Sequence, residues 1–113
     1  MIRATTPKHM FYFESDPSVY SKILITYMQN GGIVLEKTKD DLTIEEVAAP
    51  CDETKTVYVA WFRLTQEETK MFQAGPGNQV IVQVRVLTTA NEALASDKKV
   101  FNVQDVLNDE VLV

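Results

Sequence analysis

Apolar and polar residues alternate along most of this chain, with the period of two that a β-strand requires. The alternation is clearest at residues 79–87, where the even-numbered valines Val80, Val82, Val84 and Val86 share one face. Residues 22–29 are apolar on both faces, which predicts a central strand. Residues 8–14 are aromatic and closely spaced, as in a strand with both faces covered. Further strands are predicted at Val34 and Leu35, 42–45, 56–64 and 94–103.

The segments between these strands carry specific turn signals. Asn30-Gly31 accepts the positive φ angles of a tight hairpin turn, so it predicts an antiparallel pair. Residues 37–41 predict a polar crossing, residues 47–53 a surface loop, and residues 89–92 a turn. A short helical turn is expected near residues 66–73, because Thr65 and Glu68 have the T-x-x-E spacing of a capping box. Gly75-Pro76-Gly77 ends it.

Strands that outnumber helices in this way predict an all-β protein. The strand, Thr-led turn and strand of residues 57–87 favour an immunoglobulin-like Greek-key β-sandwich of about seven strands. A small closed barrel remains the alternative. Trp61 is the single tryptophan and is expected in the core. We expect one domain over residues 1–104, followed by an apolar C-terminal tail over residues 105–113.

Composition narrows the classes of partner. The formal net charge is -5, which opposes binding to the phosphate backbone of nucleic acids. No apolar run approaches the roughly 18 residues of a membrane span, and the first residues do not resemble a secretory signal. We therefore expect synthesis in a cytoplasm, with neither nucleic acid nor membrane as partner.

The residues that usually carry chemistry are sparse. Cys51 and His9 are the single cysteine and histidine, and no pattern around either indicates a nucleophile and base. The acidic pairs, such as Asp40-Asp41 and Glu67-Glu68, lack the spacing of a calcium loop. We expect no catalytic, metal or cofactor site, and predict that the protein is not an enzyme.

The C-terminal segment is more informative, because five apolar side chains follow the last predicted strand. They are Val106, Leu107, Val111, Leu112 and Val113. They need cover, either on the protein's own sheet or on a neighbouring subunit. These five are the candidate partner-binding residues.

Five segments give the chain a family resemblance: MIRATTPKHMFYF, KILITYMQNGGIVLEKTKDDL, RLTQEETKMFQAG, QVRVLT and DVLNDEVL. With them it resembles short uncharacterised proteins from the structural-gene regions of tailed phages and prophages of Gram-positive gut bacteria. It is also similar, more weakly, to the immunoglobulin-like N-terminal module of phage baseplate proteins. The fibre portion that would follow such a module does not follow in this sequence, so direct host binding is not the expected role.

The resemblance implies a non-enzymatic virion structural or assembly protein, associated with tail, baseplate or capsid. Such a protein acts through contacts with other phage structural proteins, in several copies or as a homo-oligomer. Its location would be the virion, after synthesis in the bacterial host cytoplasm. The alternative is a glycan-binding or host-adhesion module that stacks sugars on Tyr12, Tyr20 or Tyr58.

Overall fold

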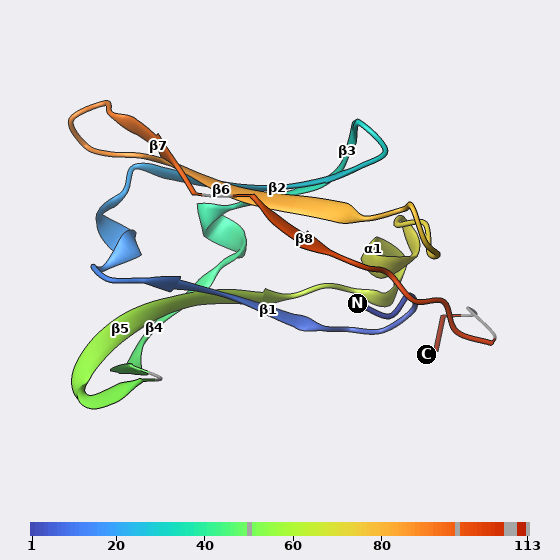
Figure 1. Ribbon diagram of the computed structural model, residues 1–113. Coiled ribbons are helices and arrows are strands. Elements are labelled where there is room, and N and C mark those ends of the chain that lie inside the picture. The colour runs from blue at the N-terminus through green and yellow to red at the C-terminus, as the bar shows by residue number, and fades with distance from the viewer. Residues whose placement is uncertain (50, 97, 108–110, 113) are drawn as a thin grey trace.

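The protein is an all-β sandwich of two antiparallel sheets, seen in a computed structural model that describes residues 1–49, 51–96, 98–107 and 111–112 (Figure 1). The strands are β1 (Lys8–Phe13), β2 (Lys22–Gln29), β3 (Gly32–Thr38), β4 (Thr43–Ala49), β5 (Asp52–Arg63), β6 (Val80–Leu87), β7 (Ala93–Ala95) and β8 (Lys99–Phe101). Short 3₁₀ turns η1 (Pro17–Val19) and η2 (Lys39–Asp41) and the helix α1 (Gln66–Lys70) connect them.

The two sheets differ in size. One holds three strands in the order β1-β5-β4, and the other holds five, with the order β3-β2-β6 and both β7 and β8 paired to β6. Figure 1 shows the two sheets as layers, with α1 closing one end between them. No helix in the described ranges is long and apolar enough to cross a membrane.

The core lies between the layers and is filled by alternate residues of each central strand. Ile23, Ile25 and Tyr27 of β2 are buried, and so are the three valines Val80, Val82 and Val84 of β6. Because β2 and β6 pair over eight residues, these side chains form one continuous apolar surface. Phe62, Leu64 and Phe72 cover it from the other layer and from the segment after α1. The predicted valine face and the predicted central position of β2 are confirmed.

Local signals in the sequence fix the connections. Asn30 and Gly31 both have positive φ, at 54° and 79°, and join β2 to β3 as a hairpin. At α1, the Thr65 hydroxyl accepts a hydrogen bond from the Glu68 amide at 3.1 Å, and the Glu68 carboxylate accepts one from the Thr65 amide at 2.9 Å. The predicted hairpin and capping box are confirmed.

The loop predicted for residues 47–53 is wrong. β4 continues to Ala49, β5 begins at Asp52, and these two residues pair with each other. The prediction rests on Pro50 and the acidic residues as loop signals, but the first residues of β5 are mostly exposed, so polar side chains are accommodated on the strand. Pro50 itself lies outside the described residues. The last predicted strand, 94–103, is divided into β7 and β8, which pair with β6 on either side of residue 97.

Trp61 does not lie in the core, contrary to the prediction. It pairs with Met10 and Thr43, both exposed, and is half-buried on the outer face of the three-stranded sheet. Its neighbours Ala60 and Phe62 point inward instead. β5 is apolar on both faces, so its alternation does not reveal which face turns inward. The expectation that both faces of β1 are covered is also wrong, since Met10 and Tyr12 remain 48% and 55% exposed.

The capping box at α1 generates a stability prediction. Replacing Thr65 with Ala removes the acceptor for the Glu68 amide, so we expect the free energy of unfolding to fall by about 1 kcal/mol. Urea denaturation followed by Trp61 fluorescence measures this loss. The same substitution at the exposed Thr89 is the control and should change stability little. Equal losses in the two variants would contradict the capping role.

Candidate protein-interaction surface

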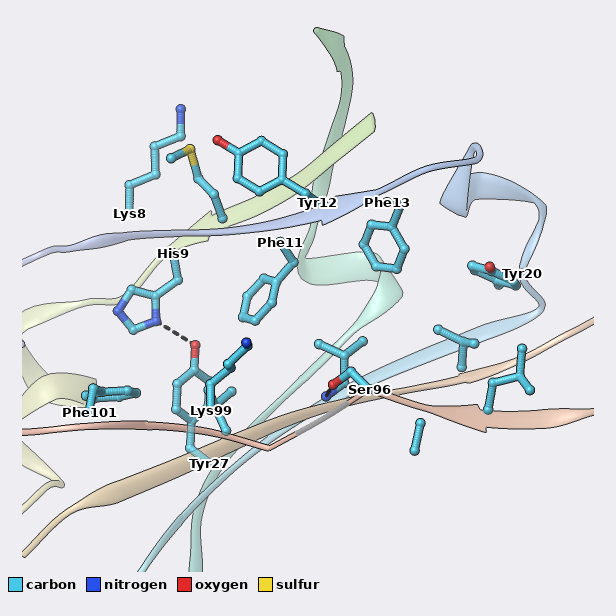
Figure 2. Close-up of a pocket in the computed structure, with 16 residues that line it drawn as sticks. Lys8, His9, Phe11, Tyr12, Phe13, Tyr20, Tyr27, Ser96, Lys99 and Phe101 are labelled. Atoms are coloured by element: carbon cyan, nitrogen blue, oxygen red, sulfur yellow. Dashed lines mark hydrogen bonds between the residues drawn. The ribbon is translucent and has the colours of Figure 1, made fainter. Parts of the chain in front are cut away.

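A groove runs along one side of the sandwich, where the edge strand β1 of one sheet faces the edge strands β7 and β8 of the other. Its volume is about 810 Å³. Figure 2 shows His9, Phe11 and Phe13 pointing from β1 toward the opposite sheet, with Tyr20 at one end and Phe101 at the other. Val82, Val84 and Val86 of β6 form the floor. The groove is thus the uncovered margin of the core.

The charge of this groove differs from that of the whole chain. Lys8 and Lys99 are among its lining residues, and none of the described residues that line it is acidic. The chain as a whole carries a formal net charge of -5. The ammonium group of Lys8 lies 4.1 Å from the centre of the Trp61 ring, on the outer face of the sheet. Carboxylates of a partner would therefore meet favourable charge at this margin.

His9 and Tyr27 join the two sheets inside the groove. Nδ1 of His9 and the Tyr27 hydroxyl are 2.6 Å apart and form a hydrogen bond (Figure 2). Burial, helped by the positive N-terminal amine, lowers the pKa of His9 below its ordinary value. Burial, helped by the Glu68 carboxylate, raises the pKa of Tyr27 well above its ordinary value. Both groups are therefore neutral near pH 7, and the pair holds the layers together rather than supplying a charged reactant.

Glu68 is the second ionisable group that links the layers. Its carboxylate is 2.5 Å from the ammonium group of Lys37 on β3. Burial alone would raise the pKa of Glu68, but hydrogen bonds from Lys37 and from the Thr65 amide and hydroxyl outweigh it and lower the pKa. The ion pair attaches α1 to the five-stranded sheet.

The residues considered for catalysis do not come together. His9 is on β1 and pairs with Phe62 of β5, whereas Cys51 is exposed in the turn before β5. Phe62 lies ten positions after Asp52 on β5, which corresponds to roughly 30 Å along the strand. In the described part of the chain, no group of three or more His, Cys, Asp or Glu residues is arranged to hold a metal ion.

The three tyrosines considered for sugar stacking do not form one row. Tyr12 is exposed on the outer face of β1. Tyr58 pairs with Phe13 and therefore lies on the opposite, inward face of the same sheet. Tyr20 is half-buried at one end of the groove. A flat platform of these three rings is therefore absent.

The candidate partner-binding residues of the C-terminal tail have mixed environments. Val106 and Val111 are half-buried, Leu107 is fully exposed, and Leu112 is 78% exposed. Val113 lies outside the described residues.

Sequence reasoning missed the residues that hold this tail. The Gln66 side chain donates to the Leu112 carbonyl at 2.8 Å and accepts from its amide at 2.7 Å, and Arg3 pairs with Asp105 at 2.9 Å. The tail is thus held at Asp105 through its side chain and at Leu112 through its backbone, but the side chains of Leu107 and Leu112 are exposed.

The His9–Tyr27 pair generates a prediction for pH dependence. Because the pKa of His9 is lowered in the folded state, the unfolded chain binds more protons, and stability should decrease as the pH falls below the ordinary value of 6.5. We expect the free energy of unfolding to fall between pH 7.5 and pH 5.5, as measured by urea denaturation.

His9→Gln is the matched variant, because its side chain retains a hydrogen-bonding group near Tyr27 but does not titrate. It should lose most of this pH dependence. The carboxylates with lowered pKa, Asp16, Asp52 and Glu68, have ordinary values of 3.8, 3.8 and 4.5 and contribute only at lower pH. An unchanged pH profile in His9→Gln would show that another group is responsible.

Comparisons with models of protein families and with curated proteins found no match to this chain.

Proposed function

We propose that this protein is a non-enzymatic component of a phage particle, or of its assembly, that acts through protein–protein contacts. The observation that carries the proposal is the C-terminal tail, where Leu107 and Leu112 are exposed although the Asp105 side chain and the Leu112 backbone are anchored. Anchored segments with exposed leucines are suited to docking on another subunit, because the entropy cost of ordering the backbone is already met. The family resemblance of the sequence supplies the phage context.

The strand order supports an immunoglobulin-like assignment. In that fold, strands B, E and D lie in one sheet, and C′, C, F and G lie in the other. The order β1-β5-β4 corresponds to B-E-D, and the order β3-β2-β6, followed by β7 and β8, corresponds to C′-C-F-G. Modules of this type serve as contact domains in many unrelated assemblies, so the fold is compatible with the proposed role.

The chemistry of the described residues favours a contact role over catalysis. His9 and Tyr27 are neutral and bonded to each other, and Glu68 is paired with Lys37. Such groups stabilise the junction between the sheets, and none of them is placed as a nucleophile with a base beside it. What remains for function is the surface formed by strand edges and the tail.

The phage role predicts that the chain is a constituent of purified particles. Particles induced from a host that carries the gene should contain it by mass spectrometry, and a gold-labelled antibody should mark one part of the particle. A non-virion protein of the same host is the control for contamination. Absence of the chain from particles, and from assembly intermediates isolated in the same lysate, would overturn the phage proposal.

The tail predicts an effect on association. Leu107→Ser and Leu112→Ser should each weaken the association of the chain with its partners or copies, because each removes an exposed apolar contact without touching the backbone anchors. Sedimentation velocity and recovery in particles measure this. Val19→Ser is the matched control, because Val19 is also exposed but lies in η1. Association equal to that of the control would contradict the role of the tail, and so would normal assembly of a chain ending at residue 104.

A further inference from the structure

The outer edge of β1 has unpaired backbone groups at alternate residues. Among the described strands, β1 is the end strand of its sheet and has β5 as its one partner. The Leu64 amide donates to the Pro7 carbonyl at 3.0 Å, so Pro7 and Leu64 form a hydrogen-bonded pair. Such pairs alternate along an antiparallel ladder, so the next ones are at His9, Phe11 and Phe13. The amide and carbonyl groups of Lys8, Met10 and Tyr12 therefore point away from β5, toward the open edge.

β1 lacks the protection that the other sheet edges have. β4 carries Glu45 and Glu46, the β2–β3 pairing contains a register shift, and β7 and β8 have three residues each. Charges, bulges and short length all discourage pairing with another strand. β1 has six residues, of which HMFYF has no acidic residue, Lys or Arg, no proline and no shift in register. It is the edge best suited to accept a strand.

Its two ends carry opposite charges. Lys8 begins β1, and Glu14 is the first residue after it; both are exposed. If a second β1 lies antiparallel to the first and centred on Phe11, Lys8 of each copy faces Glu14 of the other. Met10 then faces Tyr12. The same register makes these even-numbered residues the hydrogen-bonded pairs, which agrees with the outward direction of their backbone groups. A shift of two residues toward the N-terminus would separate the charges.

We infer that two copies of this chain associate through β1 across a two-fold axis at Phe11, joining three strands from each copy into one sheet of six. The inference deepens the proposed contact function and depends on it for its biological purpose. The interface is isologous, so each contact occurs twice. On the inward face, His9 lies opposite Phe13 of the second copy, and Phe11 lies opposite its counterpart. The aromatic margin of each groove is thereby covered by the other.

Charge exchange tests the register. Lys8→Glu and Glu14→Lys should each weaken dimerisation by roughly ten-fold, because each places like charges opposite one another twice. The double variant Lys8→Glu/Glu14→Lys exchanges the two charges and should recover most of the affinity. Sedimentation velocity at low salt measures the dissociation constants.

Lys55→Glu is the control, because it makes the same change in charge at an exposed position on β5. Lys8→Gln reports the loss of the contact with the Trp61 ring, and thermal unfolding shows that each variant is folded.

Amide hydrogen exchange gives a second readout that does not depend on substitution. In the dimer, the amides of Lys8, Met10 and Tyr12 should become protected as the concentration rises, while those of His9, Phe11 and Phe13 are protected at all concentrations.

A chain that stays monomeric at millimolar concentration would overturn the inference. A dimer insensitive to both single charge changes would also overturn it. A dimer lost on truncation at residue 104 but unaffected by the β1 variants would place the interface at the tail instead. Recovery by the double variant supports the β1 interface even if particles lack the chain, so the two proposals fail separately.

Discussion

The Tyr27 hydroxyl is buried between the two sheets, and its partner is Nδ1 of His9, 2.6 Å away. A buried hydroxyl without a partner is costly, so this bond fixes how β1 lies over β2. The Tyr27 ring also packs edge-on against Phe62, Phe72 and Phe101, at centroid distances of 6.4, 5.9 and 6.3 Å. It therefore contacts β5, β8 and the segment after α1 in addition to β1. One side chain thus determines the relative position of segments that are distant in the sequence.

This placement of β1 determines the surface of the molecule. With His9, Phe11 and Phe13 turned inward, Met10 and Tyr12 must turn outward, because the side chains of a strand alternate. The outer face of the three-stranded sheet then carries Met10, Tyr12 and Trp61 without a layer above it. The Trp61 indole N–H has no acceptor among the described residues, although its nitrogen is buried. In a two-layer sandwich only the inner faces of the sheets pack together, so apolar groups on this outer face are not covered by the second sheet.

Local interactions made much of the fold predictable from the sequence. The Asn30-Gly31 hairpin, the Thr65–Glu68 cap and the valine face of β6 each depend on residues close in the chain, and all three are confirmed. The position of Trp61 is not predictable in this way, because both faces of β5 are apolar and the face that turns inward is the one that carries Phe62, which packs on Tyr27 of β2. The His9–Tyr27 bond joins residues 18 positions apart on different sheets, so no local pattern reveals it. The groove also follows from sheet packing, whereas the apolar character of the tail was visible in the sequence and the exposure of Leu107 and Leu112 was not.

The comparison of the sheet edges connects this structure with its proposed role. A monomer gains nothing from leaving a six-residue aromatic edge unprotected, since exposed edges promote nonspecific pairing. The other edges carry charges, a register shift or short strands, so the chain has the means of protection. At β1 the charged residues instead lie at the two ends, where Lys8 and Glu14 have opposite signs. Beside a second β1, one antiparallel register would bring these opposite charges together, and other registers would separate them. In the inferred dimer, an edge of this kind would select its partner rather than exclude all partners, and the selection would follow from the positions of Lys8 and Glu14.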